Sequence, residues 1–285
     1  MKNSVRIGAH VSVGKGLIAA LEKAHDMGAN CLQIFASPPQ SFVMSKFSDA
    51  DCAAFKKRTV ELNIASVFIH ATYLINLASD NERLRTFSID SLIDDLQKAE
   101  KLGAVGSIVH TGSHKGKGFE SIVSVVVDSI EKVLAKTPTS TKLLLEIASG
   151  GSGKIGSTFE ELATLINKVD NARVGVCLDT AHMFAGGFTF DTGEKVTELA
   201  KQIETTVGWD RVWCMHVNDS KVDFGSFRDR HENIGQGKIG TVILKTLLAH
   251  EKFRTLPLIL EVPGFDEKGP DKKNVDILKS LIEKI

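Results

Sequence analysis

The chain has 285 residues, of which 42% are hydrophobic, and its 35 Lys and Arg residues balance its 35 Asp and Glu residues. This mixture excludes disordered, collagen-like and disulfide-framework proteins. A net charge of zero also argues against a nucleic-acid partner, because proteins that bind nucleic acids usually carry a basic excess. The length allows either two small domains or one large α/β barrel.

Short apolar runs alternate along the chain with longer segments of helical periodicity. Continuous apolar runs are typical of strands that are buried on both faces of a parallel sheet. In chain order, strands are predicted at residues 5–12, 31–36, 66–72, 107–111, 142–147, 173–179, 211–218 and 257–262. Helices are predicted at residues 17–27, 50–62, 84–102, 119–135, 158–169, 192–206, 242–250 and 273–285. Gly28 and Gly103 mark helix ends, while Ser48, Ser157 and Asp191 are predicted N-caps.

Strict alternation of eight strands with eight helices predicts a (β/α)8 TIM barrel, formed as a single domain over residues 1–285. A doubly wound open sheet is the structural alternative. The longest irregular stretch, residues 219–240, is rich in Gly, Asp, Arg and His. A loop of this length in a compact domain is usually functional or disordered.

The cysteines and the ends of the chain predict a location in the reducing cytoplasm. The four cysteines, Cys31, Cys52, Cys177 and Cys214, form no C-x-x-C pair, and buried reduced thiols are predicted for the three that lie within apolar strand-like runs. The first residues lack the apolar stretch of a signal peptide. No apolar run approaches the roughly 20 residues that a membrane helix needs, so no membrane association is predicted, and a monomer is the default expectation.

Six consecutive predicted strands each bring a histidine or a carboxylate to their C-terminal end. In a TIM barrel these ends form the mouth where the chemistry takes place. A single histidine at such a place is usually structural, but an unpaired ionisable group is costly to bury, so six that converge indicate a functional site. They are His70, His110, Glu146, Asp179 followed by His182, His216, and Glu261.

Two local spacings add to this set. Asp179 and His182 stand three residues apart on a turn that leaves the strand, and Asp229 and His231 stand two apart, on one side of an extended segment. Five histidines and four carboxylates without a thiolate suit Zn²⁺, Mn²⁺ or Fe²⁺. Nine ligands exceed what one ion takes, so two or three ions are predicted, and sites of this kind suit phosphoester hydrolysis.

Other polar features carry weaker signals. Residues 150–154 (GGSGK) lack the frame of a phosphate-binding loop, and a flexible loop above the site is predicted instead. His10 and His114 lie near strand ends, where both a supporting role at the site and a plain structural role stay open. His25 and His250 are predicted to be solvated within helices.

Three motifs resemble those of the endonuclease IV family of apurinic/apyrimidinic endonucleases, and the resemblance spans most of the chain. They are residues 70–77 (HATYLINL), 175–182 (GVCLDTAH) and 215–231 (MHVNDSKVDFGSFRDRH), of which the last is highly specific. The resemblance implies a zinc-dependent barrel that cleaves duplex DNA on the 5′ side of an abasic site and trims blocked 3′ ends.

The same resemblance implies three Zn²⁺ ions, with Mn²⁺ or Fe²⁺ possible at one site. The first is expected at His70, His110 and Glu146, the second at Glu146, Asp179, His216 and Glu261, and the third at His182, Asp229 and His231. Glu146 and Glu261 are the predicted catalytic carboxylates. The predicted DNA contacts are Tyr73, Gln40, Asn218, Lys221 and Arg230.

Two loops depart from the family pattern, and two other functions compete. Residues 147–152 read IASGGS, where the family usually reads NTAGQG, and residues 37–42 also differ, which puts lesion recognition in doubt. A sugar isomerase or epimerase of related fold, using one ion held mainly by carboxylates, is the second candidate, and a non-enzymatic lesion binder is the third. Because the formal charge of zero omits the ions, which would make the mouth cationic, composition does not exclude DNA.

Overall fold

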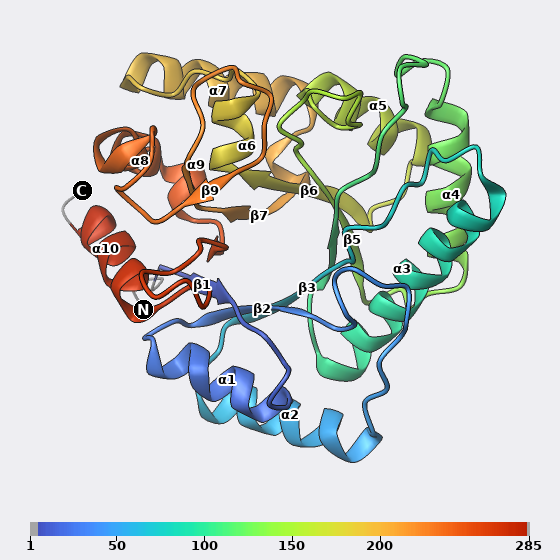
Figure 1. Ribbon diagram of the computed structural model, residues 1–285, viewed down its shortest axis with the longest axis horizontal. Coiled ribbons are helices and arrows are strands. Elements are labelled where there is room, and N and C mark those ends of the chain that lie inside the picture. Colours follow the sequence, from blue (N-terminus) through green and yellow to red (C-terminus); the bar gives the residue numbers. More distant parts are fainter. Residues whose placement is uncertain (1–4, 284–285) are drawn as a thin grey trace.

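A closed barrel of eight parallel strands lies at the centre of the computed structural model, which describes residues 5–283 (Figure 1). The strands follow one another around the barrel in the order β1-β10-β7-β6-β5-β4-β3-β2. Strand β1 closes the barrel by pairing in parallel with both β10 and β2. This closure confirms the predicted (β/α)8 TIM barrel and excludes the open sheet.

The barrel strands and the longer helices lie close to the predicted segments. The strands are β1 Ile7–His10, β2 Cys31–Phe35, β3 Ser66–His70, β4 Gly106–Val109, β5 Lys142–Glu146, β6 Val174–Asp179, β7 Val212–His216 and β10 Leu258–Leu260. The longer helices are α1 Leu17–Asp26, α2 Asp49–Glu61, α3 Glu82–Leu102, α4 Val123–Ala135, α5 Phe159–Val169, α7 Gly193–Thr206, α8 Gly240–Ala249 and α10 Lys272–Glu283. Most strands are shorter than predicted, because apolar sequence continues past the last ladder hydrogen bond into the mouth loops.

Several short elements were not predicted, since segments of a few residues show no periodicity. They are α6 Thr180–Ala185, α9 Glu251–Arg254, a 3-10 turn at Trp209–Arg211, and an antiparallel pair of β8 Asp219–Ser220 with β9 His231–Glu232. The β8–β9 pair closes the base of the long loop that was predicted to be irregular. It thereby fixes the segment that carries Asp229 and His231.

Two of the three predicted N-caps are wrong by one residue. The Ser48 hydroxyl accepts a hydrogen bond from the backbone three residues on and forms a capping box, as predicted. For α5 and α7 the caps are Thr158 and Thr192. Ser157 instead donates its hydroxyl to a backbone carbonyl behind it, and Asp191 forms an ion pair with a lysine of α7.

All four cysteines are free and buried, which confirms the prediction for the three that lie in strands, and Cys52 of α2 is buried as well. His25 is exposed on α1, also as predicted. The prediction for His250 is wrong, because its extended backbone separates α8 from α9. Its ring packs against Phe253, with 5.6 Å between the ring centroids, so it is not a solvated helix residue.

The interior of the barrel is apolar and lies directly beneath the predicted site. It is filled by Phe68, Ile108, Leu144, Cys177, Cys214 and Ile259. Each of these residues stands two positions before a predicted ligand, which lies at the end of the same strand or, for His110 and Glu261, one residue beyond it. Because side chains two apart on a strand point to the same face, the packing that closes the floor of the barrel also turns the six ligands into its mouth.

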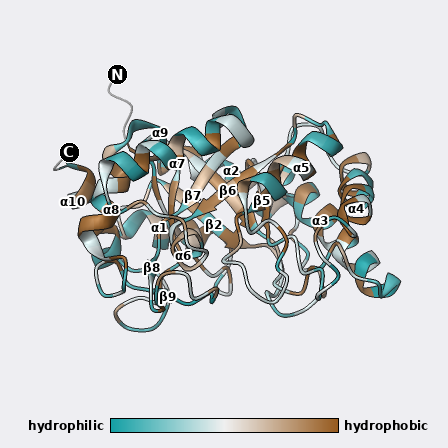
Figure 2. Ribbon diagram, turned by 90° about the horizontal axis from the view of Figure 1, so that it is seen from above, coloured by the Kyte–Doolittle hydropathy of each residue, from teal (hydrophilic) through white to brown (hydrophobic). Residues whose placement is uncertain are grey.

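The mouth loops gather at one end of the barrel, together with β8 and β9 (Figure 2). Helices of the described part of the chain are all too short or too polar to cross a bilayer.

Asp95 of α3 gives the fold a pH dependence that can be tested. Its carboxyl is buried, with the Ser107 hydroxyl 3.4 Å away, and burial raises its pKa from 3.8 to about 7. Because the folded state holds the proton more tightly than the unfolded chain, this group's stabilising contribution is complete below pH 4 and is lost as the pH rises to 7.

In the wild type, the unfolding free energy should fall by up to about 4 kcal/mol through this group as the pH rises. We expect Asp95→Asn to remove this part of the pH dependence. Urea denaturation at pH 4.5 and pH 8 measures the difference for the wild type and the variant. If the unfolding free energy changed equally between the two pH values in both proteins, the assignment to Asp95 would be contradicted.

Candidate metal centre

All nine predicted ligands converge at the mouth of the barrel. They form four overlapping groups, in each of which one ligand atom per residue lies within 4.8 Å of the others. The groups are His70–His110–Glu146, Glu146–Asp179–His216–Glu261, His110–His182–Asp229 and Asp179–His182–His231. The first two have the composition predicted for the first and second sites. The last two share His182 and together contain the three residues predicted for the third.

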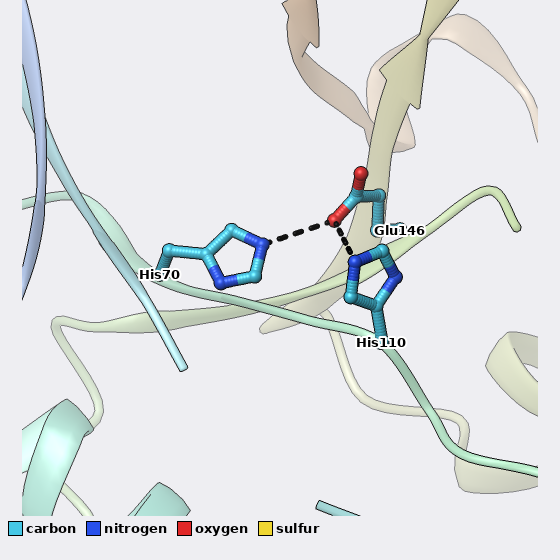
Figure 3. Close-up of side chains that lie close together, drawn as sticks. All are labelled: His70, His110 and Glu146. Carbon is cyan, nitrogen blue, oxygen red and sulfur yellow. Dashed lines mark hydrogen bonds and ion pairs between the residues drawn. The ribbon is translucent and has the colours of Figure 1, made fainter. Parts of the chain in front are cut away.

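In the first cluster the two imidazoles face one carboxylate oxygen (Figure 3). Nε2 of His70 lies 3.2 Å from Oε2 of Glu146, and Nε2 of His110 lies 3.6 Å from the same oxygen. Nδ1 of His70 donates to the carbonyl of Ala71 at 2.8 Å. A carbonyl can only accept, so this bond fixes the tautomer and leaves the Nε2 lone pair of the neutral ring facing the cluster.

Glu146 connects the first cluster with the second. Its Oε1 lies 3.2 Å from Nδ1 of His216, on the opposite side from the oxygen that faces His70 and His110. Burial raises the pKa of Glu146, but the imidazoles around it outweigh burial and hold the pKa well below its usual range. A fully buried carboxylate that presents one oxygen to each cluster has the geometry of a bridging ligand.

The second cluster favours positive charge. Nδ1 of His216 lies 3.1 Å from Oε2 of Glu261 and 3.7 Å from Oδ2 of Asp179. Burial lowers the pKa of His216, but the carboxylates of Glu261 and Glu146 raise it to about 10. Three carboxylates around one imidazole therefore hold a proton strongly. A divalent cation would supply positive charge at the same place and displace that proton.

The third cluster, formed by His182, Asp229 and His231, contains two imidazole nitrogens that have no hydrogen-bond partner among residues 5–283. Nε2 of His182 lies 3.1 Å from Oδ2 of Asp229, and Nε2 of His231 lies 3.3 Å from Oδ1. Both nitrogens are buried, yet neither is oriented to form a hydrogen bond. Their Nδ1 atoms instead face the carbonyls of Ile147 and Glu261. Side chains that approach closely without bonding to one another are arranged to bind a common third atom, and this donor set fits a divalent metal ion.

His110 is suited to bind a cation at neutral pH. Burial lowers its pKa to about 4, although the carboxylate of Glu146 opposes this shift. The ring is therefore neutral at pH 7 and has a lone pair available. His110 belongs to the first cluster and also groups with His182 and Asp229 of the third, so it lies between the two clusters.

Gln33 of β2 is a functional residue that the sequence analysis did not find. It is fully buried, its Nε2 donates to Oε1 of Glu261 at 2.6 Å, and its Oε1 accepts from Nε2 of His216 at 2.8 Å. The bond to His216 turns its Nδ1 atom toward the cluster, and the bond to Glu261 holds that carboxylate beside it. A single amide within the apolar run of residues 31–35 was the signal that could have indicated it.

His10 supports the same network, whereas His114 does not. Nδ1 of His10 lies 2.8 Å from Nε2 of Gln33 and 3.5 Å from Oε1 of Glu261. His114 accepts a hydrogen bond from the backbone of Gly118 in its own loop. Of the two roles left open for these histidines, the supporting role applies to His10 and the structural role to His114.

The structure contradicts the DNA contact predicted for Asn218. Its side chain is fully buried, Nδ2 donates to Oδ2 of Asp179 at 2.7 Å, and Oδ1 accepts from the backbone N–H of Glu261 at 2.8 Å. Because both amide atoms are bonded and buried, the side chain presents no donor to a phosphate. Asn218 instead orients two ligands of the second cluster.

The other predicted DNA contacts lie on the exposed rim. Gln40, Lys221 and Arg230 are exposed, and Tyr73 is 56% exposed. Tyr73 separates two cavities of about 790 and 780 Å³ that share Glu261 in their walls. The backbone of Tyr73 donates to Pro39 in the loop that carries Gln40. All four residues are accessible, and their contacts with DNA stay predictions.

We expect Gln33→Leu to weaken metal binding at the second cluster by about 10- to 100-fold, because His216 and Glu261 lose the amide that orients them. Zinc affinity measured by competition with a chelator tests this expectation. Gln97→Leu, on the exposed face of α3, is the matched control. Equal affinities for Gln33→Leu and the wild type would contradict the supporting role of Gln33.

Comparisons with known proteins identify the family of the chain. Residues 21–282 match the family model described as xylose isomerase-like TIM barrel. The chain is 35% identical to the probable endonuclease 4 of Halothermothrix orenii over 276 residues, which cover 96% of this chain and 99% of that protein.

Among solved structures, some neighbours share both the family and the fold of this chain, and others share the fold alone. The crystal structure of endonuclease IV from Thermus thermophilus has a TM-score of 0.86 at 34% identity and covers 98% of this chain and 100% of its own. A D-tagatose 3-epimerase-like protein has a TM-score of 0.69 at 20% identity, with 97% of both chains covered, and shares the fold alone. The chain belongs to the endonuclease 4 family of xylose isomerase-like TIM barrels.

Proposed function

We propose that this protein hydrolyses the phosphodiester on the 5′ side of abasic sites in duplex DNA, leaving a 3′-hydroxyl and a 5′-deoxyribose phosphate, and that it removes blocking groups from 3′ ends. It is a metal-dependent endonuclease of DNA repair. The observation that carries the proposal is the position of Glu146, whose two oxygens face two adjacent clusters at the edge of an open cavity.

The side chains of this protein would hold three divalent ions in the three predicted sites. When bound, such ions polarise a phosphate and lower the pKa of a water toward about 7. Glu146 and Glu261 keep negative charge beside the cavity, since burial raises their pKa values but the surrounding histidines outweigh it and lower both. The apolar floor beneath them excludes bulk water from below.

The rim of the cavity offers apolar side chains to a damaged duplex. Tyr73 and Leu74 are 56% and 40% exposed and line the same cavity as His70 and His110. Exposed large side chains of this kind can occupy the gap that a missing base leaves in the stack. The exposed Arg230, which lines the cavity as well, is suited to a backbone phosphate.

The proposal also includes the identity of the metal ions, the oligomeric state of the protein and its location in the cell. Imidazole and carboxylate ligands suit three Zn²⁺ ions, and at one of the sites Mn²⁺ or Fe²⁺ can take the place of Zn²⁺. A monomer in the reducing cytoplasm stays our prediction. Elution from a calibrated sizing column at the mass of one chain would support the monomer, and elution at twice that mass would contradict it.

The sugar isomerase alternative has weaker support. Proteins with such names share the barrel at 15–20% identity, whereas the endonuclease relatives are about 35% identical over nearly the full length. A single-ion isomerase would also have no use for Asp229 and His231, which come together with His182 here.

Incubation of the metal-loaded protein with a duplex that carries one tetrahydrofuran abasic analogue tests the proposal. We expect a single incision on the 5′ side, with a 3′ end that a polymerase extends, and no incision of the undamaged duplex. A second substrate with a 3′-phosphate tests the removal of blocked ends. Absence of incision together with epimerisation of a ketose would favour the alternative.

A further inference from the structure

Lys154 lies at the third cluster, although the sequence analysis assigned it only to a flexible loop. Its Nζ is 3.8 Å from Oδ2 of Asp229 and donates to the hydroxyl of Ser149 at 3.1 Å. It lines the same cavity as His182 and His231. Over residues 5–283, no other lysine or arginine nitrogen comes within 4.0 Å of a carboxylate of the nine proposed ligands.

The loop that carries Lys154 packs closely against neighbouring segments. Residues 150–153 all have positive φ angles, a run in which Ser152 alone has a side chain. A Cβ atom at Gly151 would lie 2.7 Å from the carbonyl oxygen of Phe227, and one at Gly153 would lie 2.7 Å from the ring of His114. Backbone hydrogen bonds join the loop to residues 112 and 114. The backbone therefore fixes Lys154 at the wall of the cavity.

Most of the hydrogen-bonding capacity of this ammonium is unused. A lysine ammonium has three N–H donors, and one is bonded to the neutral hydroxyl of Ser149. The distance to Asp229 exceeds a hydrogen bond, and the same Oδ2 faces His182 at 3.1 Å. With its side chain 34% exposed toward an open cavity, the ammonium can bind an anion there.

We propose that Lys154 is a substrate-binding residue whose ammonium contacts a non-bridging oxygen of the DNA phosphate that enters the cavity beside Asp229. This inference rests on the proposed function and names a residue for it. The contact adds a fixed positive charge at the site of the reacting phosphate. The competing role is that of a counter-ion, in which Lys154 serves only to hold Asp229 in place.

Lys154→Met and Lys154→Arg separate the two roles, with Lys132→Met on the exposed face of α4 as the matched control. Four quantities are measured on the holoenzymes: bound zinc per chain, Tm, kcat/KM for incision, and the salt dependence of Kd. For the last, the ligand is the nicked product duplex, which undergoes no further incision.

A phosphate contact predicts that Lys154→Met keeps the zinc content and Tm of the wild type and loses about 10- to 100-fold in kcat/KM. The slope of log Kd against log salt concentration should fall by about 0.9. Lys154→Arg should retain the slope, and Lys132→Met should match the wild type in all four measurements.

Loss of zinc from Lys154→Met would overturn the proposal in favour of the counter-ion. Unchanged kcat/KM and salt slope would overturn it in favour of a solvated rim residue. If the wild type fails to incise the abasic duplex, the proposed function fails by itself. The salt slopes on the nicked duplex still decide whether Lys154 contacts a phosphate.

Discussion

Glu261→Gln is expected to reduce incision by about 4 kcal/mol of transition-state stabilisation, roughly a thousandfold, while the barrel stays folded. Oε1 of Glu261 accepts from Gln33, a bond that the Gln carbonyl can also accept, and Oε2 lies 3.1 Å from Nδ1 of His216. The substitution therefore keeps the shape and one hydrogen bond of the side chain. It removes the negative charge that the second cluster offers to a cation.

Gel assays of single-turnover incision, with circular dichroism for the fold, measure this effect. Glu251→Gln, an exposed carboxylate at the start of α9, is the matched control and should retain full activity. Wild-type incision rates in folded Glu261→Gln would show that the second cluster is not part of the reaction.

Glu146→Gln is expected to cost the protein two bound ions, because one carboxylate faces two clusters. Oε2 faces His70 and His110, and Oε1 faces His216. An amide can offer only a neutral oxygen to a cation, so one cluster loses its ligand at this position and the other loses the negative charge that holds its ion. We expect zinc to fall from about three ions per chain to about one, with loss of incision.

Asp229→Asn is the comparison for this prediction, since Asp229 belongs to the third cluster and lies outside the second. It should retain about two ions per chain. Elemental analysis of both variants after dialysis against zinc-buffered solution gives the two numbers. Equal losses in the two variants would contradict the bridging position of Glu146.

Most of the barrel was predictable, because the same apolar runs indicate both the strands and the site residues that follow at their C-terminal ends. Residues such as Phe68 and His70 share one face of a strand, so an apolar run that ends in a histidine indicates both a core position and a position at the mouth. Short elements such as α6 and the β8–β9 pair were not predictable. These elements form because of contacts with other segments at the mouth of the barrel, and their local sequence does not indicate them.

The ligands were easier to find than the residues that orient them. His70 and Glu261 stand at the ends of apolar strands, where an ionisable side chain is conspicuous. Gln33 and Asn218 are amides whose hydrogen-bond partners lie on other strands. An amide is equally suited to a buried network and to DNA, so spacing alone placed Asn218 wrongly and left Gln33 out.

Lys154 was missed for a related reason. A glycine-rich run followed by lysine is typical of a surface loop, and the sequence does not show that residues 150–153 turn back toward Asp229. Packing of Gly150 and Gly151 against Phe227 produces that turn. The loop and the segment that carries Asp229 therefore position one another, and this coupling exists only in the folded chain.

Anomalous diffraction at the zinc edge from crystals of the zinc-loaded protein tests the central claim most directly. We predict three peaks: one between His70, His110 and Glu146, one beside His216 and Glu261, and one beside His182, Asp229 and His231. A single peak, or peaks away from these nine side chains, would contradict the three-ion centre on which the proposed hydrolysis depends.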